Sequence, residues 1–236
     1  MNKDSQGQTA QDMQDAQDKK TAQAAPVAQA AILDSALPAL AVEGFTESVL
    51  DKAVVAAGFQ PSVKRKAFPR GALDLAIYFI ARGTDEMEKK LATMDLPAMK
   101  VRARITQAVR TRLEIDAADK DIVRKAAYFF AQPAHAKEAA KLLGATVDAM
   151  WRAAGDTSTD SNFYSKRAIL SSVYIATRLF WLQDNSPNHR ESWAFLDRRI
   201  ENVMQIETGK AKFRELKKRF PDPLAVLARW RYGEKR

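Results

Sequence analysis

The 236-residue sequence contains no cysteine and only two histidines, His135 and His189. These absences exclude disulfides, thiolate metal sites and cysteine nucleophiles, and they leave no basis for a histidine-rich metal site. The sequence also lacks a continuous apolar run of the roughly 20 residues that a transmembrane helix needs. Its most apolar stretch, residues 24–42, is interrupted by polar residues and two prolines. No signal peptide pattern opens the chain, so we expect a cytoplasmic protein.

The residues that are present indicate a folded, basic protein. An apolar fraction of 46% is sufficient for a hydrophobic core, and the formal net charge of +9 suggests an anionic partner. That partner is either a nucleic acid or an anionic membrane surface, and net charge does not distinguish between the two.

Hydrophobic periodicity predicts an all-α fold. Nearly every segment after residue 27 repeats apolar residues at helical spacing, and no stretch alternates apolar and polar residues as a strand would. Residues 1–27 carry almost no large apolar side chain, which predicts a disordered tail. We divide the remainder into a three-helix unit (28–85), a larger helical bundle (86–209) and a basic C-terminal segment (210–236).

The three-helix unit has the pattern of a helix-turn-helix. The first helix would bury Ile32, Leu33 and Leu40 and stop at Gly44. The second would start at the N-cap Thr46, and the third at Pro61.

Three short motifs of this unit resemble TetR-type transcriptional regulators: Gly44-Phe45, Ala56-Ala57-Gly58-Phe59 and Phe68-Pro69. In that family the third helix enters the DNA major groove. Here it would present Lys64, Arg65 and Lys66 as possible DNA contacts. The run Pro61-Ser62-Val63-Lys64-Arg65 lacks the aromatic phosphate contact that regulators usually carry at these positions, so a nucleic acid is the disfavoured partner. A ligand-responsive DNA-binding regulator nevertheless remains the alternative function.

The pattern next predicts a helix that breaks or bends near Gly83 and continues into the bundle. A surface helix follows, with Met99, Ile105, Val109 and Leu113 inward and its arginines outward. A further helix would end at Gly155, another would run from about 160 to 182, and a last one would begin with Ser186 as N-cap and Pro187 as its first residue.

The segment from Met150 to Leu170 combines a polar turn with two adjacent aromatic residues. Capping and turn formation explain most of its polar side chains, and Arg167 would pair with an acid. Phe163 and Tyr164 cannot both face the core from one helix. We therefore expect at least one of them to be exposed.

This segment and the one after it resemble the ubiquinone (coenzyme Q) biosynthesis protein nine family. The resemblance runs from about residue 148 to 204 and rests on the following residues: Met150-Trp151, Ala154-Gly155-Asp156, Ser158-Thr159-Asp160, Asn162, Tyr164, Arg167-Ala168, Tyr174, Thr177, Asp184, Ser186-Pro187, Trp193, Phe195-Leu196 and Arg199.

The resemblance implies a TetR-type fold and a non-catalytic role. It implies that the protein binds an isoprenoid quinone intermediate, or a phospholipid, and presents it to a di-iron hydroxylase of the ubiquinone pathway. The partner-docking patch would comprise Met150, Asp160, Phe163 and Tyr164, with Phe163 in place of the family's tryptophan. No cofactor is expected, because the chemistry belongs to the hydroxylase. Acid–base catalysis by Asp148, Asp156, Asp160 or Asp184 has no supporting constellation.

The lipid would lie between helices of the bundle, where packing alone also predicts apolar side chains. The candidate lining residues are Leu75, Tyr78, Phe79, Tyr128, Phe129, Phe130, Leu143, Val173, Leu179 and Phe180.

In the C-terminal segment apolar residues recur three to four positions apart among basic ones, as in interfacial helices, which predicts peripheral association with the inner, cytoplasmic membrane. A solvated tail or a nucleic-acid contact is the alternative. Its predicted membrane contacts are Phe213, Leu216, Phe220, Leu224, Leu227 and Trp230. We also expect a homodimer formed through the last two long helices, as in TetR-type folds.

Overall fold

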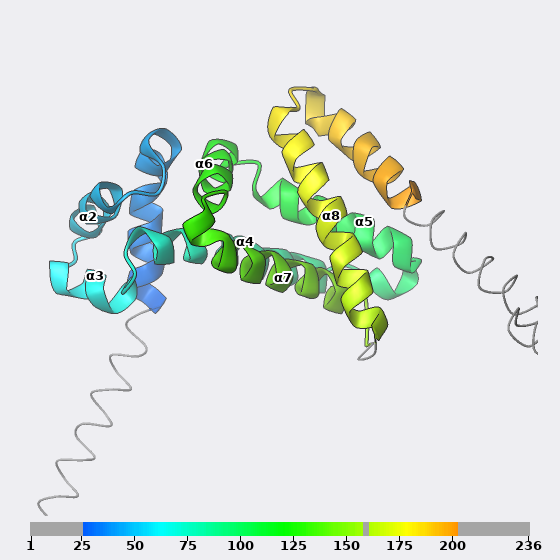
Figure 1. The fold of residues 1–236 in the computed structure, drawn as a ribbon, viewed down its shortest axis with the longest axis horizontal. Coiled ribbons are helices and arrows are strands. Elements are labelled where there is room, and N and C mark those ends of the chain that lie inside the picture. The colour runs from blue at the N-terminus through cyan, green and yellow to red at the C-terminus, as the bar shows by residue number, and fades with distance from the viewer. Residues whose placement is uncertain (1–25, 158–160, 203–236) are drawn as a thin grey trace, which may run out of the picture. The chain divides into compact units, whose positions relative to one another are not determined.

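The computed structural model describes residues 26–157 and 161–202, and every regular element in these ranges is a helix (Figure 1). The predicted all-α class is therefore confirmed for this part of the chain. The predicted tail falls almost wholly outside the described residues, although the first helix already begins at residue 26. The chain forms two compact units, which divide after Tyr174 within the long helix α8.

The N-terminal helices follow the sequence prediction closely. The first helix spans residues 26–43, and α2 (Glu47–Ala56) and α3 (Pro61–Ala67) follow it (Figure 1). Ile32, Leu33 and Leu40 are fully buried. The hydroxyl of Thr46 accepts a hydrogen bond from the backbone amide of Val49 at 3.2 Å, which confirms Thr46 as the N-cap of α2.

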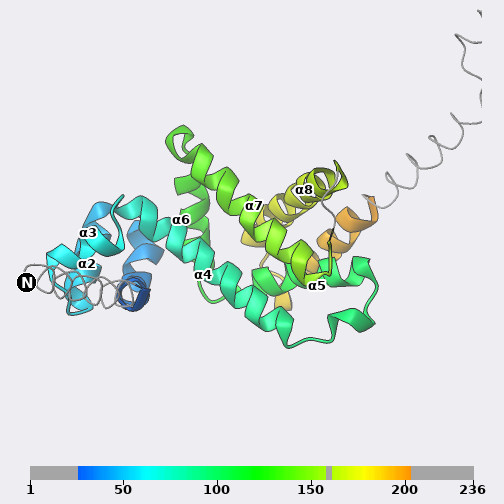
Figure 2. The ribbon, with the colours of Figure 1, turned by 90° about the horizontal axis from the view of Figure 1, so that it is seen from below.

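The long helix α4 (Ala72–Ala92) packs against α5 (Val101–Ile115) and α7 (Ala136–Ala153), as Figure 2 shows. The predicted break at Gly83 is wrong, since α4 is continuous through this residue. Gly83 instead provides space: a Cβ atom there would lie 2.8 Å from Nη2 of Arg112.

Arg112 also corrects the prediction that every arginine of α5 faces solvent. Its side chain is fully buried and pairs with the buried Asp116 one turn later. Asp116 and the carbonyl of Ile80 accept hydrogen bonds from its guanidinium. Burial of a charge is tolerated when such partners are present, so Arg112 can occupy a position at which the pattern would place an apolar residue. Met99 is likewise not inward, because it precedes α5 and is partly exposed.

The remaining helices of the first unit are α6 (Lys120–Phe130), α7 and the start of α8 (Ser161–Gln183). The 3-10 turn η1 (Leu96–Ala98) connects α4 to α5, and η2 (Pro133–His135) connects α6 to α7.

In the second unit, the last helix begins at residue 190 rather than at Pro187. Pro187–His189 form a 3-10 turn, η3, in which Asn188 and His189 adopt positive φ angles. Ser186 still serves the helix start, because its hydroxyl accepts a hydrogen bond from the amide of Glu191 at 3.1 Å. No helix within the described ranges is both long and apolar enough to cross a bilayer.

Candidate functional site

A turn follows α7, and we call its described residues, 154–157, the docking turn. Buried and half-buried charges hold this turn in place. Gly155 ends α7 with a φ of +84°, a conformation that residues with a Cβ rarely adopt. Asp156 follows it, and its carboxylate is almost completely buried. A carboxylate in this position needs cationic partners, and α8 provides two of them.

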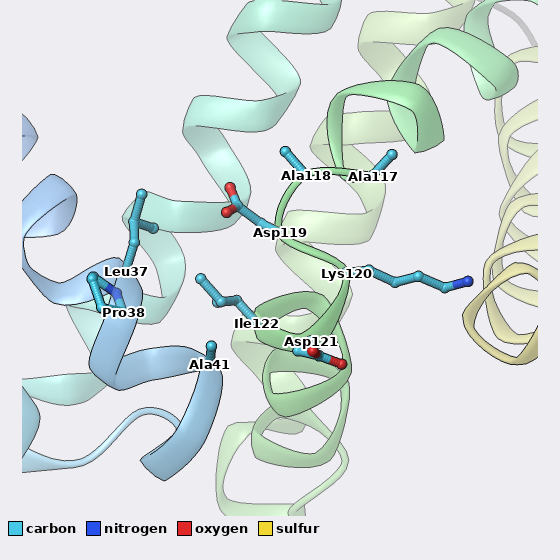
Figure 3. Close-up of a pocket in the computed structure, with 9 residues that line it drawn as sticks. All are labelled: Leu37, Pro38, Ala41, Ala117, Ala118, Asp119, Lys120, Asp121 and Ile122. Carbon is cyan, nitrogen blue, oxygen red and sulfur yellow. The ribbon is translucent and has the colours of Figure 1, made fainter.

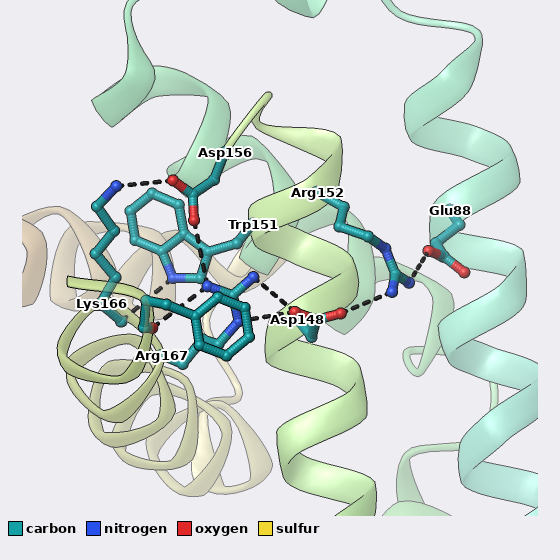
Figure 4. A network of polar contacts seen from close by, with 8 residues as sticks. Glu88, Asp148, Trp151, Arg152, Asp156, Lys166 and Arg167 are labelled. Carbon is teal, nitrogen blue, oxygen red and sulfur yellow. Dashed lines mark hydrogen bonds and ion pairs between the residues drawn. The ribbon is translucent and has the colours of Figure 1, made fainter. Parts of the chain in front are cut away.

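The first partner is Arg167 of α8, which bonds both to Asp156 in the turn and to Asp148 on α7 (Figure 4). Its Nε donates to Oδ1 of Asp148 on α7 at 2.7 Å, and its Nη1 donates to Oδ2 of Asp156 at 3.2 Å. A planar guanidinium can make both bonds at once, whereas a lysine ammonium could not reproduce this geometry. The predicted pairing of Arg167 with an acid is therefore confirmed, with two acids instead of one.

The second partner is Lys166, whose ammonium lies 2.7 Å from the other carboxylate oxygen of Asp156. The indole nitrogen of Trp151 donates to the backbone carbonyl of Lys166 at 3.2 Å, and the Lys166 ammonium lies 5.5 Å from the centre of the indole ring. These contacts fix the first turns of α8 against the end of α7.

A second guanidinium, that of Arg152, extends the network to α4. Arg152 donates to Asp148 at 2.6 Å and to Glu88 at 2.7 Å (Figure 4). The hydrogen bond to Glu88 is the main cause of the raised pKa of Arg152. Because Arg152 is more than half exposed, we expect this bridge to contribute little to stability.

The two adjacent aromatic residues at the start of α8 have different surroundings. The guanidinium carbon of Arg167 lies 3.4 Å from the ring centre of Phe163, which is partly covered. Tyr164 is 74% exposed, and its ring meets Phe163 edge-on at 5.1 Å. The prediction that one aromatic of the pair is exposed is confirmed.

Of the other two predicted docking residues, Met150 lies in the core with an exposed fraction of 0%. It shares the inward face of α7 with Val147, so it supports the turn from beneath and contributes no surface. Asp160 lies outside the described residues.

Sequence reasoning missed Arg104 of α5, which fastens the docking turn from a distance. Its Nη1 donates to the carbonyl of Ala154 at 2.9 Å, while Nε and Nη2 donate to the carbonyls of Met99 and Pro97 at 2.8 Å and 2.9 Å. Carbonyls at a helix C-terminus lack intrahelical partners, so Arg104 satisfies one of them in α7. No local pattern links residue 104 to residue 154.

Two kinds of known protein sequence resemble this chain: a family model and individual relatives. The COQ9 family model matches residues 136–207, a range that contains the docking turn and α8. The ubiquinone biosynthesis protein COQ9 of Drosophila melanogaster is 31% identical over 182 residues, and that of Homo sapiens is 28% identical over 182 residues. The chain is thus similar to COQ9 proteins over three quarters of its length.

The alignments cover most of this chain but only part of each relative. The Drosophila alignment covers 75% of this chain and 56% of the relative, and the human alignment covers 74% and 57%, so the chain spans about half the length of these COQ9 proteins. Both relatives are named as mitochondrial proteins.

The fold of this chain is that of TetR-type regulators. The crystal structure of a TetR transcriptional regulator from Nitrosomonas europaea covers 75% of this chain and 98% of its own, with a TM-score of 0.62 and 21% identity. At this identity the likeness establishes the fold alone, and it confirms the predicted TetR-like architecture.

The predicted lipid-lining residues occupy different environments. Leu75, Phe79 and Val173 are buried, while Tyr78, Phe129, Phe130, Leu143 and Phe180 are half-buried. The rings of Phe79 and Phe129 pack on the ring of Phe45, at 5.9 Å and 5.8 Å between ring centres. These aromatic contacts are part of the packing between α4, α6 and the segment before α2.

Two of the predicted lipid-lining residues are not interior. Tyr128 is 70% exposed, because it lies away from the buried face of α6 formed by Ile122, Val123 and Ala126. Leu179 is 51% exposed. For the other eight residues, lipid contact stays a prediction.

A hollow of about 410 Å³ lies elsewhere, between the first helix and the start of α6 (Figure 3). None of the predicted lipid residues lines it. Its walls combine small apolar side chains with Asp119, whose pKa is raised by burial. The lining residues are Leu37, Pro38, Ala41, Ala117, Ala118, Asp119, Lys120, Asp121 and Ile122.

The possible DNA contacts of α3 are not equivalent. Lys64 is engaged within the protein by Asp51 at 2.6 Å and by Glu47 at 2.8 Å. The hydrogen bonds to these two carboxylates raise its pKa. Arg65 and Lys66 remain exposed. Pairing of Lys64 with acids of α2 removes the first of the three charges from the basic run that a phosphate backbone would meet.

The predicted membrane contacts from Phe213 to Trp230 lie outside the described residues. Among the residues that the structure describes, no group of three or more histidine and carboxylate side chains is placed to hold a metal ion.

Proposed function

We propose that the protein takes part in ubiquinone biosynthesis as a non-catalytic accessory protein. It binds an isoprenoid quinone intermediate, or a phospholipid when no quinone is present, and presents it to a membrane-associated di-iron hydroxylase. Two observations support this proposal: relatives over three quarters of the chain are named as ubiquinone biosynthesis proteins, and the matched segment contains the docking turn.

Tyr164 is the observation that carries the docking part of the proposal. Its ring is exposed, yet the helix that bears it is fixed by the bonds of Arg167, Lys166 and Trp151. An aromatic residue held in a fixed position loses little conformational entropy on binding, which is why rigid tyrosines are frequent anchors at the centre of protein interfaces. The charged residues around it suit the rim of such an interface.

The same contacts support a binding role over acid–base chemistry. Among the described residues, Asp156 lies in the docking turn and Asp148 in the helix before it, and each carboxylate is already paired with cations of the protein. A general base must instead reach a substrate proton.

In this proposal the protein is cytoplasmic and associates peripherally with the inner membrane, with the hydroxylase as its partner there. It forms a homodimer through α8 and the helix of residues 190–202, as TetR-type proteins do. DNA binding as a ligand-responsive regulator is disfavoured by the pairing of Lys64 with Glu47 and Asp51.

Mass spectrometry of organic extracts tests the lipid part of the proposal. The purified protein is extracted in parallel with an unrelated helical protein of similar charge. We expect isoprenoid quinone or phospholipid in near-stoichiometric amount from this protein only. An empty extract, together with duplex DNA binding that is sequence-specific and falls steeply with salt, would overturn the proposal in favour of the regulator.

A further inference from the structure

Seven consecutive residues at the junction of η1 and α5 are exposed to solvent. They combine small or flexible apolar side chains with two basic ones and contain no acid; Met99 is 37% exposed and Val101 is 54% exposed. We call them the 97–103 segment, which consists of Pro97, Ala98, Met99, Lys100, Val101, Arg102 and Ala103.

The backbone of this segment is fixed with its side chains outward. Leu96, directly before it, is buried in the core. Arg104, directly after it, donates hydrogen bonds to the carbonyls of Pro97 and Met99. Isolated exposed apolar residues are ordinary on protein surfaces. Here the protein uses a buried leucine and an arginine to hold several of them together in solvent, which calls for a binding role.

The 97–103 segment also lies beside the docking turn. The Arg104 guanidinium, which bonds the carbonyls of Pro97 and Met99, also donates a hydrogen bond to the carbonyl of Ala154, the residue before Gly155. One side chain therefore connects the segment to the end of α7 at 2.9 Å.

We propose that the 97–103 segment is a contact site for an anionic membrane surface. Met99 and Val101 would enter the interfacial region, while Lys100 would meet a lipid phosphate. Surfaces that combine apolar and basic residues without acids bind anionic lipid, with about 1 kcal/mol from each basic residue near the surface. A protein partner fits less well, because lysine is depleted at protein interfaces and the segment has no aromatic anchor.

This inference deepens the proposed function. It rests on one part of that proposal, namely that the hydroxylase partner is associated with the membrane. It names a contact separate from the predicted C-terminal one, and it places the docking turn near the bilayer surface. A hydroxylase embedded there would then meet Tyr164 without leaving the membrane.

The absence of cysteine from the sequence allows a direct test. Met99→Cys is labelled with an environment-sensitive fluorophore in the full-length protein. The matched control is Val42→Cys, labelled in the same way at another exposed apolar position, in the first helix. Each protein is mixed with phosphatidylcholine vesicles that contain or lack phosphatidylglycerol, and binding is measured independently by cosedimentation.

We expect the label at residue 99 to brighten and shift to the blue only with phosphatidylglycerol vesicles, and the label at residue 42 to remain unchanged. The proposal is overturned if the protein cosediments while the label at residue 99 stays in water, if both labels respond alike, or if no cosedimentation occurs. A response to the purified hydroxylase without lipid would also overturn it, in favour of a protein interface.

A charge variant gives a second readout. Lys100→Gln should weaken binding to phosphatidylglycerol vesicles about fivefold, whereas Lys66→Gln, at an exposed lysine of α3, should leave binding within about twofold of the unaltered protein. Equal effects of the two variants would assign the attraction to net charge and contradict the proposal. Quinone in the organic extract is independent of both outcomes, so failure of this inference and failure of the proposed function are distinguishable.

Discussion

Gly83 of α4 lies directly against the buried guanidinium of Arg112 on α5, so that a Cβ atom at residue 83 would come within 2.9 Å of three guanidinium atoms. The glycine therefore does not interrupt its helix. It lets two helices approach around a buried ion pair, because Gly83 leaves room for the guanidinium and the carboxylate of Asp116 balances its charge.

Gly83→Ala should therefore destabilise the protein, although alanine favours helix more than glycine does. The added methyl group requires the buried Arg112 to move, at an expected net loss of about 1–3 kcal/mol in the free energy of unfolding. Gly144→Ala is the matched control, since nothing lies within 4 Å of a Cβ at that exposed position of α7. It should stabilise by about 0.5–1 kcal/mol. Urea unfolding of both variants checks this, and equal stabilisation by both would show that the close contact is absent.

Arg167→Lys should loosen the docking turn although it keeps the charge. A single ammonium cannot bond Asp148 and Asp156 together while covering the ring of Phe163. We expect a loss of about 1 kcal/mol in stability and faster amide hydrogen exchange at the start of α8. Arg152→Lys, at a more exposed bridge, should change stability by less than about 0.5 kcal/mol. Identical exchange in the two variants would contradict the role given to Arg167.

The lowered pKa of Asp184 predicts that the folding stability of the second unit depends on pH. Burial would raise its pKa, but hydrogen bonds from Ser192 and Ser186 to the carboxylate outweigh burial and hold the pKa well below its ordinary value. A lowered folded-state pKa stabilises above the unfolded value of about 3.9, and this stability is lost as the pH falls below it.

Asp184→Asn should thus cost about 1–2 kcal/mol near neutral pH, because the asparagine cannot accept the same charge-assisted bonds. The difference from the unaltered protein should shrink as the pH falls from about 5 to about 3. The control Asp197→Asn removes an exposed carboxylate of the last helix. Urea unfolding as a function of pH gives the answer, and a difference that stays constant down to about pH 3 would refute the assignment.

Features set by local chemistry could be predicted from sequence. Thr46 as an N-cap, Gly155 as the end of α7 and the exposure of one aromatic residue at the start of α8 each depend on residues a few positions apart, and each is confirmed. The all-α class follows from helical periodicity in the same way.

Features set by distant partners could not be predicted. The role of Gly83 was not predictable because the side chain for which it makes room, Arg112, lies 29 positions later. The role of Arg104 was not predictable because its acceptor is the carbonyl of residue 154. Met150 belongs to the matched segment, but only the packing of α7 shows that its side chain is interior. A family resemblance names positions without distinguishing the residues that touch a partner from those that support them.

The account depends most on Tyr164 as an exposed anchor for the hydroxylase. The most direct test is isothermal titration of the purified di-iron hydroxylase with Tyr164→Ala and with Tyr128→Ala, a tyrosine equally exposed on α6. Both variants should unfold within about 0.5 kcal/mol of the unaltered protein. Tyr164→Ala alone should weaken binding, by about 30-fold or more. Unchanged hydroxylase affinity in Tyr164→Ala would contradict the docking role assigned to this turn.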